Sequence, residues 1–244
     1  MAANPSNPVH WQQQGLGRAV LAAEHQLLSL ALDDVFGFEL LQLGNWGPAR
    51  ELIGISRTRI QRVVGPEAPG ARAPDVVANL AMLPIAGASV DAVLLPHCLE
   101  TESDPYAVLR EADRVLVGEG HLIVLGFQPL SLWGLRAAAS RTGFPPGSRR
   151  MLGARRVREW LKLLGYEVDP VRRYLYMWPG DAGPREPRGG QPSIPGLLHR
   201  GLLNPFPAGA YLLKARKRIH APTPIRPRRR ESGTVLGGLP NPSA

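Results

Sequence analysis

The chain has 244 residues, of which 44% are hydrophobic and 20% are charged, a composition that indicates a folded globular protein and excludes a disordered or collagen-like chain. The formal net charge of +9 is regional: residues 1–135 have a net charge of −6, whereas basic residues dominate segments 136–162 and 214–230. The single cysteine, Cys98, excludes an intramolecular disulfide and leaves no cluster for a structural metal ion, so we expect no metal site and a reducing compartment.

The amino-terminal residues lack the pattern of a targeting segment. Residues 1–15 contain neither the basic opening nor the apolar core of a secretory signal, and no apolar run in the chain approaches the roughly 20 residues that span a bilayer. We therefore treat residues 1–15 as an extension and expect a cytoplasmic protein without a membrane partner.

The first predicted element is an amphipathic helix over residues 16–32. Its apolar residues, among them Leu16, Val20 and Leu27, are mostly three or four positions apart, which places them on one helix face. Short apolar runs bounded by Gly, Pro, Asn or Asp then predict strands at residues 38–43, 52–55, 76–78 and 92–95.

A well-marked helix begins the next part of the chain. Asp104 can cap free backbone N–H groups and Pro105 suits the first helical position, and we expect Gly118 and Gly120 to end this helix. After it we predict a buried strand, a helix and two further strands, over residues 121–127, 153–165, 167–171 and 210–215. Alternating strands and helices predict an α/β fold, with a parallel sheet covered by helices on both faces.

Two segments do not follow this alternation. Residues 179–207 are rich in Pro and Gly and are predicted to form a long irregular insertion. Residues 219–244 have the composition of a basic, disordered tail. The expected organisation is one domain over residues 16–218, with an extension at each end.

The exit of the first strand is the place to look for a site, because ligands bind beyond the carboxyl ends of the strands in an open parallel sheet. Residues 40–47 have the sequence LLQLGNWG, in which Gly44 allows a tight turn and a close backbone approach to a ligand. Two nearby glycines after a strand are more often a plain turn, so this segment alone does not identify a site.

Three later segments extend the pattern: NLAMLP at 79–84, SVDAVLLPHCLE at 89–100 and DPYAVLREADRVLVGEGHLIVLGF at 104–127. Over residues 38–127 this succession resembles the class I S-adenosylmethionine-dependent methyltransferases, particularly the methyltransferase type 11 group. Residues 128–136, QPLSLWGLR, resemble a narrower group of bacterial methyltransferase-like proteins with a basic carboxyl-terminal tail. The resemblance implies S-adenosylmethionine as cofactor and a Rossmann-like, doubly wound, mostly parallel sheet of seven strands.

The resemblance also implies cofactor-binding residues along one edge of the sheet. The turn after the first strand would surround the methionine part, Ser56 would hold the ribose hydroxyls, and Asn79 and Leu80 would border the adenine. The end of the fourth strand would lie beside the sulfonium. The implied set is Gln42, Gly44, Asn45, Trp46, Gly47, Ser56, Asn79, Leu80, Pro96 and His97.

Several of these positions depart from the family pattern. Gln42, Ser56 and Asn79 stand where the family commonly has carboxylates, and Trp46 replaces a glycine. The three polar side chains can form hydrogen bonds but bring no negative charge to a cationic ligand, so we expect weaker cofactor binding. An indole that filled the hollow beyond the first strand would leave no room for adenosine.

Methyl transfer demands little chemistry from the protein, because a sulfonium methyl group is already electrophilic. The protein must align the acceptor and remove a proton where the acceptor carries one. His97, with Glu100 close behind it, is the candidate catalytic base; the alternative is a histidine that is simply hydrogen-bonded at a strand end. For Cys98 we favour core packing over a nucleophilic role.

The sequence leaves the methyl acceptor and the role of the basic segments open. Segment 136–162 could attract an anionic acceptor, segment 214–230 could bind nucleic acid, or both could be solvated surfaces. A second functional class also fits, namely a catalytically degenerate methyltransferase fold that binds RNA or a protein partner. A nicotinamide-dependent enzyme is disfavoured because no G-x-G-x-x-G follows the first strand.

Overall fold

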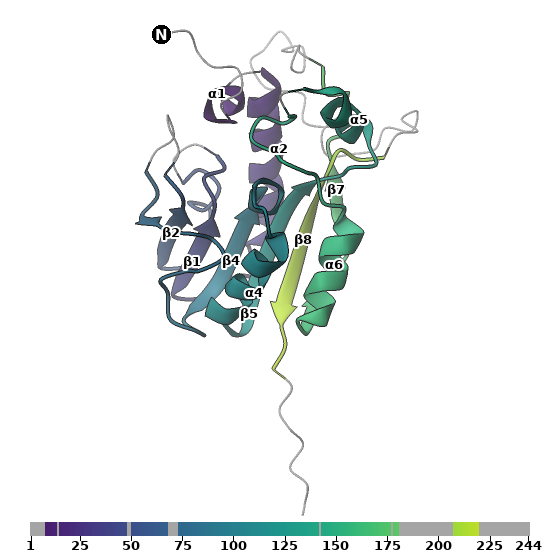
Figure 1. Ribbon diagram of the computed structural model, residues 1–244. Helices are drawn as coiled ribbons and strands as arrows, with labels where there is room; N and C mark the ends of the chain where they lie inside the picture. Colours follow the sequence, from purple (N-terminus) through teal and green to yellow (C-terminus); the bar gives the residue numbers. More distant parts are fainter. Residues whose placement is uncertain are drawn as a thin grey trace, which may run out of the picture.

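An eight-stranded sheet is the central feature of the computed structural model (Figure 1). The structure describes residues 8–13, 15–47, 50–67, 73–141, 143–176, 178–180 and 207–219. The strands are β1 (Glu39–Leu43), β2 (Ile60–Gly65), β3 (Val76–Val77), β4 (Val90–Pro96), β5 (Leu116–Phe127), β6 (Tyr166–Val168), β7 (Arg172–Tyr174) and β8 (Ala210–Lys217).

The order of the strands is that of a doubly wound sheet. Seven of them lie in the order β3-β2-β1-β4-β5-β8-β6, and β7 pairs with β8 beside this path. The pairs among β1 to β5 are parallel, whereas β8 runs antiparallel to β5, β6 and β7. This confirms the predicted Rossmann-like α/β fold, with one strand more than the seven expected.

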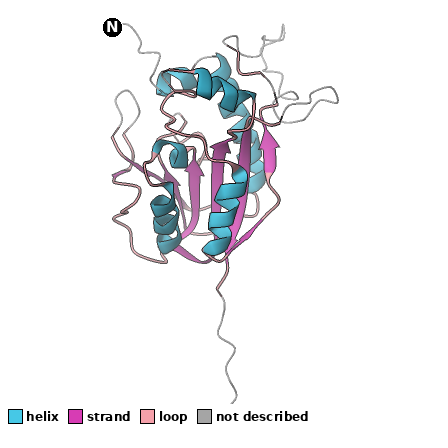
Figure 2. Ribbon diagram, turned by 45° about the vertical axis from the view of Figure 1, so that its right-hand side comes forward, coloured by secondary structure: helices cyan, strands magenta, loops and turns pink. Residues whose placement is uncertain are grey.

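Helices cover both faces of the sheet (Figure 2). They are α1 (Pro8–Gln12), α2 (Gly15–Ala31), α3 (Cys98–Thr101), α4 (Pro105–Val115), α5 (Leu132–Ala139) and α6 (Ala154–Leu163). The buried face of α2 belongs to one apolar core, and the buried faces of α4 and α6 belong to the core on the other side of the sheet. In the described part of the chain, no helix is long and apolar enough to cross a membrane.

Helix α2 forms where the sequence predicts it, and one residue interrupts its apolar face. Leu16, Val20 and Leu28 are buried between α2 and the sheet, as their spacing requires. Glu24 lies among these buried residues and has an exposed fraction of 0%. Since a buried carboxylate needs hydrogen-bond donors, the partners of Glu24 require an explanation.

Helix α4 begins as predicted but ends differently. Asp104 accepts hydrogen bonds from two backbone N–H groups of the first turn, and Pro105 stands in that turn. The predicted stop at Gly118 and Gly120 is wrong, because β5 starts directly after α4 and contains both glycines. Gly120 lets β5 approach β4 closely: a Cβ there would lie 2.9 Å from the carbonyl oxygen of Asp91.

The strand predicted over residues 52–55 is also wrong. These residues form a turn in which Leu52 and Ile53 both enter the core beside α2, whereas a strand would direct adjacent side chains to opposite faces. The second strand is β2, which pairs with β1 along its length. Gln61 is partly buried and Arg62 is exposed, so the first half of β2 is polar and lacks an apolar run.

The remaining predicted elements agree in part with the structure. The helix predicted over 153–165 is α6, and the strand over 210–215 lies within β8. The strand over 167–171 overlaps β6, which ends at Val168, and β7 is an unpredicted strand. Most of the extension 1–15, the insertion 179–207 and the tail 219–244 lies outside the described residues.

Candidate functional site

A turn over residues 44–47 leaves β1 at the edge of the sheet where the carboxyl ends of β1, β2 and β4 meet. Gly44 begins this turn with a φ of +94°, and its N–H donates to the carbonyl oxygen of Val64 in β2 over 2.8 Å. A Cβ on Gly44 would lie 2.8 Å from the Cβ of Cys98, which is buried as expected. Both the backbone conformation and this contact therefore require glycine.

The side-chain amide of Gln42 holds the turn in shape. Gln42 lies in β1 and is 3% exposed, and its Nε2 donates to the carbonyl oxygens of Gly44 (3.0 Å) and Trp46 (2.9 Å). Its Oε1 is buried and has no hydrogen-bond partner among the described residues. Buried acceptors without a donor are rare in folded proteins, so Gln42 presents an unused acceptor at the turn.

Two further side-chain amides surround the turn in the same way. Gln12 in α1 accepts from the N–H of Gly47 through Oε1 (3.2 Å), and Asn45 donates through Nδ2 to the carbonyl oxygen of Pro66 (2.6 Å). Gln12 Nε2 and Asn45 Oδ1 are buried without a partner in the part of the chain that the structure describes. Together with Gln42, these side chains present one unused donor and two unused acceptors.

Three ionisable side chains lie together next to this turn. His97 follows β4, has a left-handed backbone (φ 54°) and begins the short helix α3. Its Nε2 lies 2.8 Å from Glu24 Oε1, and its Nδ1 lies 3.1 Å from Glu100 Oε2. None of the three side chains is more than 1% exposed. We call Glu24, His97 and Glu100 the Glu–His–Glu cluster.

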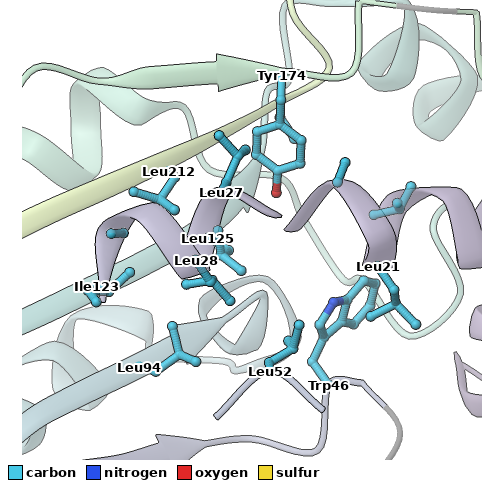
Figure 3. Packing of buried hydrophobic residues seen from close by; sticks show 14 of the residues in the cluster. Leu21, Leu27, Leu28, Trp46, Leu52, Leu94, Ile123, Leu125, Tyr174 and Leu212 are labelled. Carbon is cyan, nitrogen blue, oxygen red and sulfur yellow. The ribbon is translucent and has the colours of Figure 1, made fainter. Parts of the chain in front are cut away.

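Glu24 connects this cluster to two other elements. It accepts hydrogen bonds from the indole N–H of Trp46 (2.8 Å, to Oε2) and from the hydroxyl of Tyr174 in β7 (3.1 Å, to Oε1). In Figure 3 the indole nitrogen of Trp46 and the hydroxyl oxygen of Tyr174 both point toward α2. One carboxylate thus satisfies donors from the turn after β1, from β7 and from the end of β4.

The environment of His97 does not favour its predicted role as a base. Burial by itself lowers the pKa of His97, but Glu24 and Glu100 outweigh it and raise that pKa to about 9. The pKa of Glu100 is raised above its usual value, because the effect of burial exceeds the opposing effect of His97. Because both ring nitrogens face carboxylate oxygens, His97 has no free position to take a proton from a methyl acceptor. These contacts favour the alternative interpretation, in which His97 is a hydrogen-bonded histidine at a strand end.

The indole of Trp46 is buried among aromatic side chains from α1 and from the ends of β4 and β5. Its side chain is 7% exposed, and its ring centroid lies 4.4 Å from that of His97 and 6.0 Å from those of Trp11 and Phe127. These contacts place the ring beside β4 and β5, whereas β2 and β3 lie on the other side of β1. The ring contacts of the indole are therefore with α1 and with the ends of β4 and β5.

Comparisons with known proteins agree with the fold described above. Residues 48–124 match a family model described as a methyltransferase domain. The uncharacterized protein YafS from Escherichia coli is 34% identical over 170 residues, which cover 68% of this chain and 68% of YafS. The chain belongs to the class I S-adenosylmethionine-dependent methyltransferases.

Solved methyltransferase structures share the fold. A possible histamine N-methyltransferase from Thermotoga maritima has a TM-score of 0.56 and 17% identity, and the match covers 86% of this chain and 94% of that one. An S-adenosylmethionine-dependent methyltransferase from Mesorhizobium loti has a TM-score of 0.53 and 17% identity, with 82% and 100% covered. These likenesses concern the fold of the methyltransferase and not its acceptor.

Most positions that the family resemblance implies do come together at one edge. Pro96 ends β4 and is buried beside the turn after β1. Asn79 follows β3, is exposed, and accepts from the N–H of Ala81 through Oδ1 (2.9 Å). Leu80 is 2% exposed, and its Cδ1 lies 4.0 Å from the position of a Cβ on Gly44.

Ser56 is the exception. It lies before β2, toward the amino ends of the strands, and its hydroxyl is 3.0 Å from that of Thr58. The structure therefore places Ser56 away from the carboxyl edge where the other implied residues lie, and its assignment to the ribose stays a prediction that this position does not favour. Glu67 is an exposed acidic residue that follows β2 at the carboxyl edge, and the sequence analysis did not name it because it expected no strand at residues 60–65.

Two other residues at this edge also escaped the sequence analysis. Glu24 could have been recognised from the sequence, because a lone carboxylate among the apolar residues of an amphipathic helix needs a buried partner. Gln12 could not have been recognised in this way, since α1 has only five residues and no periodic pattern. Glu100 was named only as a neighbour of His97.

A separate surface hollow of about 220 Å³ is lined by Asp34, His121, Glu167, Asp169, Lys214, Ala215, Arg216 and Arg218. His121 pairs with Ala92 near the start of β4, so this hollow lies toward the opposite edge of the sheet. Two ion pairs lie within this lining, Lys214 with Asp34 and Arg218 with Glu167. The hollow is therefore separate from the edge formed by the carboxyl ends of β1, β2 and β4.

Proposed function

We propose that this chain binds S-adenosylmethionine at the edge formed by β1, β2 and β4 and transfers its methyl group to an acceptor that is not yet identified. The supporting observation is the set of unsatisfied amide atoms around the turn after β1. The amino-acid end of the cofactor has an ammonium donor and a carboxylate acceptor. Gln42 Oε1 and Asn45 Oδ1 suit the ammonium group, and Gln12 Nε2 suits the carboxylate.

The residues beyond β2 and β3 fit the nucleoside part. With β2 placed at residues 60–65, the acidic ribose-binding position of the family corresponds to Glu67, and its carboxylate can accept from both ribose hydroxyls. Asn79, exposed after β3, can offer its amide to the adenine. We therefore propose that the adenosine lies on the side of β1 where β2 and β3 are.

The bound cofactor supplies an electrophilic methyl group, so the protein acts by orientation and by exclusion of water. Gln42 fixes the carbonyl groups of the turn, and Trp46 and Phe127 form a buried aromatic wall beside it. His97 does not receive the proton of the acceptor, because both of its nitrogens are engaged. The reaction class that suits this site is methyl transfer to an acceptor aligned in the line of the departing sulfur.

The acceptor that suits this edge is anionic. The backbone N–H groups of Arg149 and Arg150 donate to the carbonyl oxygen of Glu100 over 2.9 and 3.3 Å, which places their loop against α3. Both arginine side chains are exposed. Two positive charges therefore stand beside the carboxyl end of β4, where they attract a negatively charged molecule.

Calorimetric titration with S-adenosylmethionine tests cofactor binding. We expect the wild type to bind, and Gln42→Met, which removes the amide at nearly constant length, to bind about 10-fold more weakly. Gln26→Met is the matched control, since Gln26 is exposed on α2, and it should bind as the wild type does. Absence of heat from the wild type at millimolar cofactor would contradict the proposal.

Transfer of the labelled methyl group tests the reaction. The protein is incubated with radiolabelled S-adenosylmethionine and fractionated cell extract, and label is expected in one acceptor fraction with anionic character. RNA binding that is sensitive to salt, by a protein that binds no cofactor, would instead support the catalytically degenerate alternative.

A further inference from the structure

The Glu–His–Glu cluster has a net charge of −1 wherever its protons lie. Each of its two contacts, 2.8 Å at His97 Nε2 and 3.1 Å at His97 Nδ1, needs one proton to be a hydrogen bond and not a repulsion between lone pairs. With both protons on the ring, an imidazolium faces two carboxylates. With one proton on Glu100, a neutral histidine lies between a carboxylic acid and a carboxylate, and the net charge is the same.

This charge has no basic partner among the described residues, where no Lys or Arg side chain pairs with Glu24 or Glu100. The other donors to the two carboxylates are neutral: the indole of Trp46, the hydroxyl of Tyr174 and the backbone N–H of Phe127. Because the cluster is buried, water screens it poorly. A buried net charge is costly, and a cation that approaches it offsets that cost.

We propose that the Glu–His–Glu cluster selects the charge of the ligand at this edge, favouring a sulfonium compound over the neutral thioether that remains after methyl transfer. The inference rests on the proposed function, because it assumes that the cofactor binds beside the turn after β1. The cluster brings from α2 and α3 the negative charge that Gln42 and Asn79 do not provide.

Trp46 links the cluster to the turn that would hold the ligand. Its indole N–H donates to Glu24, its ring lies 4.4 Å from that of His97, and its carbonyl oxygen accepts from Gln42. The indole of Trp46 therefore connects the carboxylate of Glu24 directly to the turn. At such short range, poorly screened charges interact strongly. Donation to a carboxylate also increases the electron density of the indole, which favours a cation at its face.

Three ligands that differ at one atom group test the proposal by calorimetry at neutral pH. S-Adenosylmethionine has a sulfonium, sinefungin has a protonated amine in its place, and S-adenosylhomocysteine has a neutral thioether. In the wild type we expect both cations to bind about 10-fold more tightly than the thioether. Glu24→Gln keeps the shape of the side chain and removes the charge, so the ratio should fall toward 1.

The matched control is Tyr174→Phe, which removes a hydrogen bond to Glu24 and leaves the charge of the cluster unchanged. It should weaken all three ligands alike, if at all, and retain the ratio. A structural defect would also weaken all three ligands alike. A change in the ratio of cation affinity to thioether affinity therefore indicates charge selection and not misfolding. Should Glu24→Gln not fold, as judged by circular dichroism, Glu100→Gln removes the same unit of charge and provides the second test.

The outcomes for this inference and for the proposed function are distinct. Equal binding of the three ligands by the wild type, or an unchanged ratio in a folded Glu24→Gln, overturns charge selection and leaves cofactor binding intact. Failure of all three ligands to bind the wild type overturns the proposed function and the inference with it.

Discussion

Glu24 and His97 are 73 positions apart in the sequence, yet Glu24 Oε1 lies 2.8 Å from His97 Nε2, and neither side chain is more than 1% exposed. This contact joins α2, which precedes the sheet in the chain, to the carboxyl end of β4. Since Glu24 also accepts from Trp46 and Tyr174, a polar network inside an apolar core connects α2 and β7 with the carboxyl ends of β1 and β4.

The first prediction is that loss of the Glu24 carboxylate strongly destabilises the protein. Glu24→Ala leaves the indole of Trp46, the hydroxyl of Tyr174 and one nitrogen of His97 buried without an acceptor. We expect the free energy of unfolding to fall by about 3–5 kcal/mol. Urea denaturation followed by tryptophan fluorescence measures this change.

Glu51 supplies the control for this experiment because it is exposed in the turn before β2. Glu51→Ala should change the free energy of unfolding by no more than about 0.5 kcal/mol. If Glu24→Ala were as mild as its control, the network around Glu24 would not contribute to stability as described.

The raised pKa of His97 predicts that stability falls as pH rises above neutrality. Burial lowers the pKa of His97, but Glu24 and Glu100 raise it to about 9, against 6.5 in the unfolded chain. The folded state therefore holds the proton more tightly. The resulting stabilisation, on the order of 3 kcal/mol, is complete below about pH 6.5, declines from there to about pH 9, and is absent above.

Urea denaturation at a series of pH values between about 6.5 and 9 tests this dependence. The slope should be absent in His97→Gln, which cannot titrate in this range. His121, whose pKa burial lowers, binds its proton less tightly in the folded state and titrates below this window. A wild-type stability that stays constant across the window would show that His97 does not carry the extra proton.

The fold was predictable from the sequence where one physical signal dominates. The apolar stripe of α2, the cap of α4 and the buried run of β5 each depend on residues close together in the chain. The second strand was not predictable in this way. Residues 52–55 are apolar because they pack beside α2, whereas β2, near one edge of the sheet, has exposed positions that interrupt its apolar pattern.

The candidate site was predictable only in its local part. Gly44 marks the turn after β1 because a backbone requirement is visible in a single residue. The Glu–His–Glu cluster depends on contacts between α2, α3 and β4, and a sequence pattern does not encode which buried carboxylate meets which histidine. A role of His97 as base requires a free ring nitrogen, whereas the fold places a carboxylate oxygen next to each of its two nitrogens.

Gly44→Ala should destabilise the protein through two separable causes. The φ of +94° is unfavourable for alanine, and the new Cβ would meet the Cβ of Cys98 at 2.8 Å, so we expect a loss of about 1–3 kcal/mol. In a Cys98→Gly background the contact is gone and only the backbone cost remains. A double-mutant cycle by urea denaturation measures the difference, and equal costs in both backgrounds would argue against the contact.

Glu67 and Ser56 provide the sharpest comparison between the observed and the predicted second strand. If the residue that follows β2 binds the ribose, Glu67→Gln removes a charged acceptor from that position. This change should weaken S-adenosylmethionine binding about 10-fold or more. Ser56→Ala, before β2 and toward the other edge, should leave binding unchanged. Both variants should retain wild-type stability within about 0.5 kcal/mol, because neither side chain is buried. Calorimetric titration of the two variants distinguishes Glu67 from Ser56 as the ribose-binding residue. Weaker binding in Ser56→Ala alone would assign the ribose to Ser56 and contradict the assignment to Glu67.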